Sequence, residues 1–222
     1  MRSDIVKQSA ISGLYPILDA DWLEKSGFTA TPQAVAAQFG HLQLPVVQLR
    51  CKRDGGAQYQ FMSHWLEGFR QAAPQTVVII NDRLDIALAL GADGVHVGQD
   101  DLPPAVCRQL LGPDRWLGLS THNSEEIAQA HKAGVDYIGF GPVHSTATKG
   151  DTYDVQGYDR LSQACAEAGE LPIVGIGGIE LETIEPCLQA GVSAVAMISS
   201  LWRQDWQQRL EHAAQRIHQQ TS

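Results

Sequence analysis

The sequence predicts an α/β protein, a single-domain (β/α)8 TIM barrel, on three observations. Short apolar runs recur along the 222 residues, amphipathic helix-forming stretches separate them, and most runs end in polar residues. Strands that alternate with helices indicate a parallel sheet, and eight such units indicate closure into a barrel. The eight runs are GLYPILD (13–19), PVVQLRC (45–51), TVVIIND (76–82), GVHVGQ (94–99), WLGLST (116–121), YIGFGPV (137–143), PIVGIGG (172–178) and AVAMISS (194–200). Barrels of this kind place their active sites at the carboxyl ends of the strands, so function is read there.

Length and composition limit the class of protein further. A chain of 222 residues is short for this barrel, so we expect short loops, one domain over residues 1–222 and a short N-terminal extension before about residue 13. No stretch approaches the ~20 apolar residues of a membrane span, and the N-terminus does not have the pattern of a signal peptide. The four cysteines are widely scattered, which fits reduced thiols and a cytoplasmic location.

The net charge of −9 argues against nucleic acid and anionic membranes as partners. We therefore expect small-molecule substrates. The sequence does not decide between a monomer and a homo-oligomer.

Local signals mark where the intervening helices begin and end. Thr31 is a good N-cap for a helix that starts at Pro32 and runs to about residue 41. A second helix is predicted over 58–73, and Pro74 ends it. Gly91 is a good C-cap for the helix that follows the third run.

The C-terminal half repeats this pattern. A helix over 123–134 starts at Asn123 with acidic residues in its first turn, which suits the helix dipole. In the helical stretch 181–191, Pro186 predicts a kink or a late start. The last helix is predicted from about Trp202 to His218.

A polar cluster ends the second run. Gln48, Arg50 and Lys52 share one parity, so their side chains should face the same side of the strand. Burying three such groups without partners is costly, and a basic pair beside an amide suits an oxyanion such as diphosphate. The alternative is a salt-bridge network inside the barrel.

Acidic residues follow the third and fourth runs. Asn81 and Asp82 end one, and Asp101 follows the other, with Asp100 a weaker candidate. Two carboxylates at adjacent strand ends suit Mg²⁺, which takes one or two protein carboxylates and fills its shell with phosphates and water. The alternative makes Asp82 and Asp101 N-caps of the helices that follow.

Hydroxyl-rich and glycine-rich ends complete the mouth. Ser120 and the loop 144–150, with Lys149, are common phosphate contacts but by themselves weak evidence for one. For His122, a role in supporting a neighbouring site residue or in capping is favoured over an acid–base role. The G-I-G-G-I segment (175–179), with Ile198 and Ser199 after the eighth run, matches the phosphate site that such barrels build there. The alternative is a tight turn that needs glycine.

Two anion sites follow from these placements. One lies over strands two to six and suits a metal–diphosphate, and the other lies over strands seven and eight and suits a monophosphate. This arrangement is typical of a transferase that joins a diphosphate-activated group to a phosphorylated acceptor.

The motifs closely resemble those of the thiamine-phosphate synthase (thiamine-phosphate pyrophosphorylase) family from about Leu14 to Leu201. The matching segments are LYPILD, QLRCK, NDRLDIALALGADGVHVGQDDLP, GLSTH, DYIGFGPVHSTATKG, GIGGI and MISS. The resemblance implies condensation of 4-amino-2-methyl-5-(diphosphooxymethyl)pyrimidine with 4-methyl-5-(2-phosphoethyl)thiazole to thiamine phosphate and diphosphate. It also implies a dissociative mechanism in which diphosphate leaves before the thiazole nitrogen attacks.

The resemblance implies a role for each matched residue. The pyrimidine diphosphate would be held by Gln48, Leu49, Arg50, Cys51, Lys52, Asn81, Ser120 and Lys149. Mg²⁺ would be bound by Asp82 and Asp101. The thiazole phosphate would be lined by Thr146, Ala147, Thr148, Gly178, Ile198 and Ser199. Arg50, Lys52, Ser120 and Lys149 would take part in catalysis.

The chain departs from the family pattern at three positions. Cys51 replaces a common acidic residue, Ser145 a common proline and His144 a usual aromatic ring, and none of these removes a proposed ligand. One rival function is that of a related thiazole tautomerase, which would lack the basic pair, the acidic pair or T-x-T-K. Another is a non-catalytic barrel that binds a thiamine precursor.

Overall fold

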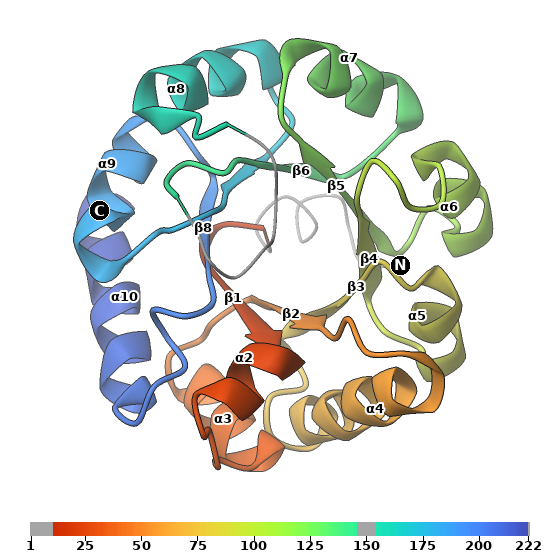
Figure 1. The fold of residues 1–222 in the computed structure, drawn as a ribbon, viewed down its shortest axis with the longest axis vertical. Helices are drawn as coiled ribbons and strands as arrows, with labels where there is room; N and C mark the ends of the chain where they lie inside the picture. Colours follow the sequence, from red (N-terminus) through yellow and green to blue (C-terminus); the bar gives the residue numbers. More distant parts are fainter. Residues whose placement is uncertain (1–10, 146–153, 222) are drawn as a thin grey trace.

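The structure is a closed barrel of parallel strands surrounded by helices (Figure 1). This computed structural model describes residues 11–145 and 154–221. Within these residues, eight strands pair in chain order from β1 to β8, and β8 closes on β1. The predicted (β/α)8 barrel is therefore confirmed. The strands are β1 (Gly13–Asp19), β2 (Val46–Arg50), β3 (Val77–Asn81), β4 (Gly94–Val97), β5 (Trp116–Thr121), β6 (Tyr137–Phe140), β7 (Ile173–Gly175) and β8 (Ala194–Met197).

The helices form the outer ring in Figure 1. They are α2 (Ala20–Lys25), α3 (Pro32–His41), α4 (Gly55–Ala72), α5 (Leu84–Leu90), α6 (Pro104–Leu111), α7 (Ser124–Ala133), α8 (Gly157–Ala168), α9 (Ile184–Gln189) and α10 (Trp206–Thr221), with a short 3₁₀ turn η1 (Leu181–Thr183) before α9. The strands are buried almost throughout because the helices cover one face and the barrel interior fills the other.

The predicted helix caps are largely confirmed. The Thr31 side chain accepts a hydrogen bond from the backbone N–H of Ala34 at 3.2 Å, and Asn123 accepts one from Glu126 at 2.9 Å. Gly91 and Gly134 end α5 and α7 in the left-handed conformation, where glycine carries no side-chain penalty.

Other helix boundaries differ from expectation. Helix α2 was not predicted, α4 begins three residues before position 58, and α10 begins at Trp206 instead of about Trp202. Pro186 lies in the first turn of α9, where its missing N–H has no helical partner to lose, so a late start is the correct alternative.

In the described part of the chain, no helix is long and apolar enough to cross a membrane. The expected N-terminal extension falls mostly on residues outside the described ranges. The expectation of one domain over residues 1–222 stays a prediction.

Candidate active site at the barrel mouth

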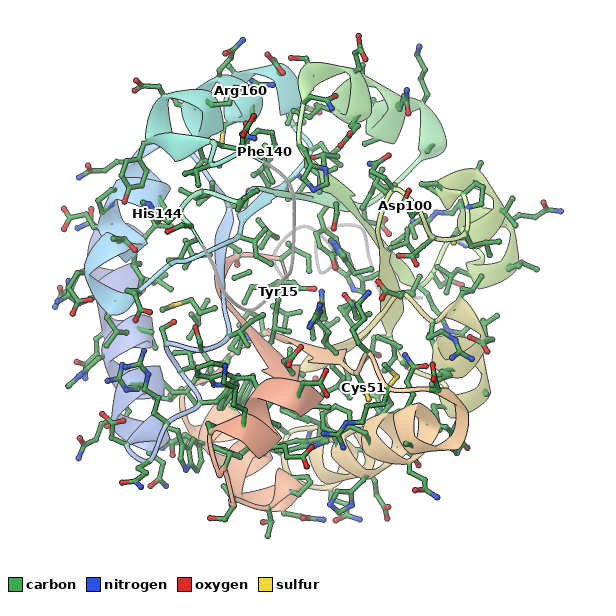
Figure 2. All side chains as sticks on the ribbon, viewed as in Figure 1. Tyr15, Cys51, Asp100, Phe140, His144 and Arg160 are labelled. Atoms are coloured by element: carbon green, nitrogen blue, oxygen red, sulfur yellow. The ribbon has the colours of Figure 1, made fainter. Side chains whose placement is uncertain are left out.

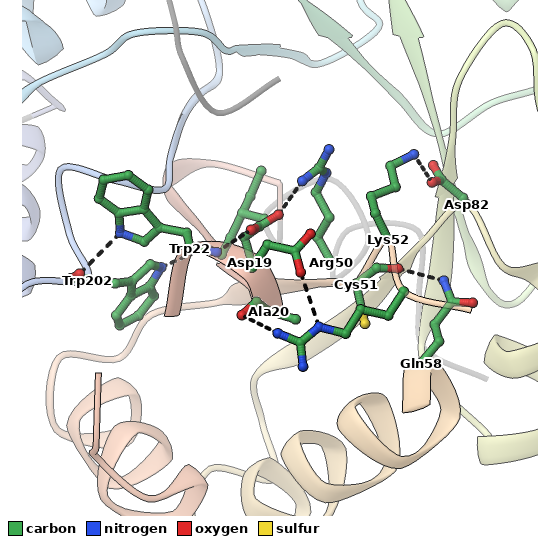
Figure 3. A network of polar contacts seen from close by, with 12 residues as sticks. Asp19, Ala20, Trp22, Arg50, Cys51, Lys52, Gln58, Asp82 and Trp202 are labelled. Atoms are coloured by element: carbon green, nitrogen blue, oxygen red, sulfur yellow. Dashed lines mark hydrogen bonds and ion pairs between the residues drawn. The ribbon is translucent and has the colours of Figure 1, made fainter. Parts of the chain in front are cut away.

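The second strand presents a buried amide and guanidinium followed by an exposed ammonium. Gln48 and Arg50 are buried in β2, whereas the Lys52 side chain is 51% exposed beyond the strand end. The Arg50 guanidinium pairs with Asp19, which lies opposite it at the end of β1 (Figure 3). Arg50 Nε is buried with no hydrogen-bond partner among the described residues. The salt-bridge alternative is therefore realised for Arg50, while Nε leaves capacity for a further acceptor.

Asp19 is a site residue that the sequence analysis missed. One carboxylate oxygen pairs with Arg50, and the other accepts the backbone N–H of Trp22 at 2.8 Å, which caps α2. Asp19 is the polar residue that ends its strand, so the rule that found the other polar strand ends would have found it.

Leu49 and Cys51 alternate with the polar pair along the strand. Both side chains are buried and, by the parity of a strand, point away from the face that carries Gln48 and Arg50. The Cys51 carbonyl accepts a hydrogen bond from Gln58 Nε2 at 2.7 Å, which ties this strand end to α4 (Figure 3). Any contact of Leu49 or Cys51 with a ligand at the mouth would therefore use the backbone.

The two candidate metal ligands lie directly after β3 and in the loop after β4. Asp82 has a φ of 62°, unusual for a residue with a side chain, and its N–H donates to the His96 carbonyl at 2.7 Å. Lys52 Nζ lies 2.5 Å from Asp82 Oδ2, and Asp101 Oδ2 accepts the N–H of Gly98 at 2.7 Å. The helices α5 and α6 follow Arg83 and Pro103, and neither aspartate caps them. The N-cap alternative is wrong for both residues.

The carboxylates of Asp82 and Asp101 are close enough to influence one another. The pKa of Asp101 is raised by burial, to which the neighbouring Asp82 adds through its charge and a side-chain hydrogen bond. No group of three or more His, Cys, Asp or Glu side chains with metal-ligand geometry occurs in the described residues. Two converging carboxylates fit Mg²⁺ that completes its shell with phosphate oxygens and water. Asp100 is exposed.

Asn81 ends β3 and Ser120 lies near the end of β5, on either side of β4 in the barrel wall. Asn81 is buried and opposite His96 in the β3–β4 register. Ser120 is half-buried, its Oγ lies 3.0 Å from His96 Nε2, and its carbonyl accepts Gln99 Nε2 at 2.6 Å. His96 was not selected from the sequence, although it lies in an apolar run, where a buried imidazole requires partners.

The glycine-rich loop after β7 packs against the loop after β6. Gly178 has a φ of 62°, and a Cβ there would lie 2.5 Å from the Ser145 carbonyl oxygen. Gly177 has a φ of 103°, and a Cβ there would lie 2.7 Å from Pro142 Cα. Loop packing alone therefore requires glycine at both positions, as the tight-turn alternative proposed. A phosphate site at the same loop is compatible with this packing.

The end of β8 supplies Ile198 and Ser199. Ile198 is buried and Ser199 is half-buried, with its carbonyl accepting Arg203 Nε at 3.0 Å. The next residue, Ser200, is buried and donates to the Ile179 carbonyl at 2.9 Å. Ser199 is therefore the accessible hydroxyl, and Ser200 ties this end to the glycine loop.

Two histidines near the mouth have local partners. His122 Nδ1 lies 3.0 Å from Glu126 Oε2, which also accepts the His122 N–H. The N-cap of α7 is Asn123, so the His122 side chain supports this helix start through Glu126 and does not itself cap it. His144 Nε2 lies 2.9 Å from the Tyr158 hydroxyl, and the two rings meet edge to face at 5.1 Å. His144 thus takes part in an aromatic contact where the family usually has an aromatic ring.

Four candidate residues, Thr146, Ala147, Thr148 and Lys149, lie outside the described residues. Their roles stay predictions. The described residues divide the mouth into a charged side over β1 to β5 and a glycine-rich side over β6 to β8.

Comparison with known proteins decides the family. The family model described as thiamine monophosphate synthase matches residues 14–201. The chain belongs to this thiamine monophosphate synthase family. The thiamine-phosphate synthase of Koribacter versatilis is 38% identical over 92% of this chain and 95% of its own length. That of Chlorobium phaeovibrioides is 44% identical over 71% of this chain and 75% of its own length.

One solved structure agrees with this assignment, and another agrees in fold. A thiamine phosphate pyrophosphorylase from Pyrococcus furiosus matches with a TM-score of 0.80 and 26% identity over 97% of this chain and 99% of its own. A 3-hexulose-6-phosphate synthase matches with a TM-score of 0.63 at 14% identity over 92% of this chain and 99% of its own, a likeness of fold alone.

Proposed function

We propose that this chain condenses 4-amino-2-methyl-5-(diphosphooxymethyl)pyrimidine with 4-methyl-5-(2-phosphoethyl)thiazole and forms thiamine phosphate and diphosphate. The observation that carries the proposal is the gathering of Arg50, Lys52, Asp82 and Asp101 on one side of the mouth, opposite a glycine loop. The names of the relatives support the same reaction.

Mg²⁺ is part of the proposal. Asp82 and Asp101 would hold it, and it would supply positive charge to the oxygens of the diphosphate. The raised pKa of Asp101 supports this role, because burial and a neighbouring carboxylate disfavour its charge until a cation lies beside it.

The chain's own cations serve the departure of diphosphate. A dissociative reaction needs stabilisation of the charge on the leaving group more than it needs a strong base. Arg50, paired with Asp19, presents a buried guanidinium whose Nε has no hydrogen-bond partner among the described residues. The exposed Lys52 can turn from Asp82 to the diphosphate. Ser120 would donate one further hydrogen bond.

The acceptor would bind on the opposite side. Backbone N–H groups of the β7 loop around Gly178 and the accessible Ser199 hydroxyl suit a monophosphate. Holding both substrates in one mouth brings the thiazole nitrogen to the methylene carbon that the diphosphate leaves.

We also propose a cytoplasmic location, which the free thiols of Cys51, Cys107, Cys165 and Cys187 support. Whether the chain forms a homo-oligomer can be measured by light scattering.

The test is incubation of the purified chain with both substrates and Mg²⁺, followed by chromatography of thiamine phosphate and an assay of released diphosphate. We expect equal amounts of the two products and loss of both with a chelator. Binding without turnover would favour the precursor-binding barrel. Isomerisation of the thiazole without diphosphate release would favour the tautomerase.

A further inference from the structure

A continuous chain of hydrogen bonds crosses the barrel interior from β2 to β5. Gln48 Nε2 donates to the Tyr15 hydroxyl at 3.1 Å, and the Tyr15 and Tyr137 hydroxyls lie 2.7 Å apart. The Tyr137 hydroxyl lies 3.1 Å from His96 Nδ1, and His96 Nε2 lies 3.0 Å from Ser120 Oγ. Figure 2 shows Tyr15 near the middle of the ring of strands. The two ends of this relay, Gln48 and Ser120, are both proposed substrate contacts.

The barrel interior is shaped around this relay. A Cβ at Gly118 would lie 2.3 Å from both His96 Nδ1 and Tyr137 Cζ, and one at Gly139 would lie 3.3 Å from His96 Cε1. Glycines on β5 and β6 therefore leave the space that the two rings occupy. The rings of Tyr137 and His96 also contact one another at 5.4 Å between centroids.

Both tyrosine hydroxyls of the relay keep their protons. Burial raises the pKa of Tyr15 and of Tyr137 far above the ordinary value for tyrosine. A neutral hydroxyl has one hydrogen to donate and lone pairs with which to accept. Each tyrosine can therefore donate to only one of its neighbours in the relay.

The first bond favours one direction of the relay. A buried hydroxyl needs an acceptor for its hydrogen, and the Gln48 amide nitrogen can only donate, so Tyr15 accepts from Gln48 and donates to Tyr137. By the same rule Tyr137 donates to His96 Nδ1, and a neutral imidazole then carries its proton on Nε2. Nε2–H donates to Ser120 Oγ, so the Ser120 hydroxyl hydrogen is not used within the relay.

We propose that Tyr15, Tyr137 and His96 are positioning residues that direct the Ser120 hydroxyl hydrogen toward the diphosphate. This inference rests on the proposed role of Ser120 as a contact of that group. With the opposite donor direction, Ser120 would donate its hydroxyl hydrogen to His96 Nε2. Its oxygen would then present only lone pairs to an anion. The relay thus decides whether Ser120 attracts or repels the leaving group.

The first test is made on the substrate-free protein and does not depend on its activity. Long-range ¹H–¹⁵N correlation spectra of histidine-labelled protein distinguish the two neutral tautomers, and a His96→Gln variant identifies the His96 signals. We expect the Nε2–H tautomer. An Nδ1–H or doubly protonated His96 would overturn the direction of the relay even if the enzyme were fully active.

The second test measures coupling between the relay and Ser120. Tyr137→Phe keeps the ring contacts but removes the hydroxyl, and we expect kcat to fall about tenfold, the scale of one hydrogen bond to a charged group, with the KM for thiazole phosphate unchanged. In a Ser120→Ala background the same substitution should have little further effect on kcat, because both act through one hydroxyl. Equal losses in both backgrounds would contradict the proposal.

Controls separate positioning from folding. Tyr158→Phe removes a hydroxyl that contacts His144 outside the relay, and it should leave the His96 tautomer unchanged. Should Tyr137→Phe fail to fold, Tyr15→Phe interrupts the relay one bond earlier and should give the same non-additivity with Ser120→Ala. Additive losses there would overturn the inference equally.

Discussion

The two sides of the barrel mouth are built by different means. Over β1 to β5, charged side chains pair with one another, as in Arg50 with Asp19 and Lys52 with Asp82. Over β6 to β8, the described structure relies on the backbone, where Gly177 and Gly178 take positive φ angles and pack against the neighbouring loop. The charged side is organised by electrostatics and the glycine side by steric fit.

This difference predicts how each side responds to substitution. The like charges of Asp82 and Asp101 weaken the fold unless a cation balances them, so removing one of them can spare stability while activity is lost. The opposite charges of Arg50 and Asp19 differ, because removing one partner leaves the other buried and unpaired. A glycine loop in contact with backbone has no such reserve, so a side chain there disturbs folding and function together.

The largest effect is expected from the carboxylate pair. Asp101→Asn should reduce activity by roughly 10²-fold or more, because it removes a charge that holds the proposed cation. Since the pKa of folded Asp101 is raised, native stability falls as the pH rises through that pKa, and the neutral amide removes this loss.

Melting curves at neutral pH show whether Asp101→Asn raises or lowers the stability of the fold. In Mg²⁺-free buffer Asp101→Asn should melt at a higher temperature than the wild type, and Mg²⁺ should raise the melting temperature of the wild type alone. Asp82→Asn should show the same loss of activity. Wild-type turnover in both variants would mean that the carboxylates do not hold a metal.

The second comparison is between the two cations of the charged side. Arg50→Ala leaves the Asp19 carboxylate buried without its partner, so both activity and about 3–5 kcal/mol of unfolding free energy should be lost. Lys52→Ala removes a half-exposed side chain, so activity should fall while the unfolding free energy changes by less than about 1 kcal/mol.

Urea unfolding measures the unfolding free energy of each variant, and initial rates measure its activity. The double variant Arg50→Met with Asp19→Asn is the matched control, since it removes the unpaired charge and keeps an acceptor for the Trp22 N–H. It should recover stability and remain inactive. Recovery of activity with stability would show that Arg50 serves the fold alone.

A smaller effect on activity, with a clear effect on the fold, is expected at Gly178. Gly178→Ala places a methyl group against the Ser145 carbonyl at a positive φ, so we expect a loss of unfolding free energy of about 1 kcal/mol or more. The KM for thiazole phosphate should rise more than that for the pyrimidine diphosphate. Gly112→Ala, with a φ of 74° and open space around its Cβ, provides the control for the backbone term alone. Equal destabilisation by the two would argue against loop packing.

The smallest effect is expected from the two neighbouring serines at the end of β8. Ser199→Ala removes one accessible hydroxyl and should raise the KM for thiazole phosphate several-fold, on the scale of ~1 kcal/mol, without changing stability. Ser200→Ala removes the buried bond to Ile179 and should lower stability by a similar amount with little direct effect on KM. Thermal unfolding and initial rates distinguish them, and an exchange of the two results would contradict the placement of Ser199.

The sequence predicted much of this architecture because strand and helix signals are local. The barrel follows from apolar runs, and Thr31, Asn123 and Gly91 mark helix ends with chemistry that acts within three or four residues. Pairings across strands were harder. The Asp19–Arg50 pair and the contact of Gly178 with Ser145 depend on register and loop packing, which no local pattern contains.

The relay illustrates the same limit. Tyr15, Tyr137 and His96 lie inside apolar runs, and the local sequence around each predicts only a core residue. Their function depends on hydroxyl and imidazole groups from separate strands meeting within the barrel. The sequence signal for such a residue is a polar group within an otherwise apolar strand. This signal indicates that a hydrogen-bond partner exists but not which residue it is.

The most direct test of the two-sided mouth is a measurement of both Michaelis constants in Lys52→Ala and Ser199→Ala. Each variant changes one accessible side chain on one side of the mouth. We predict that Lys52→Ala lowers kcat and raises the KM for the pyrimidine diphosphate alone, whereas Ser199→Ala raises the KM for thiazole phosphate alone. Parallel changes for both substrates in both variants would contradict the division of the mouth into two anion sites.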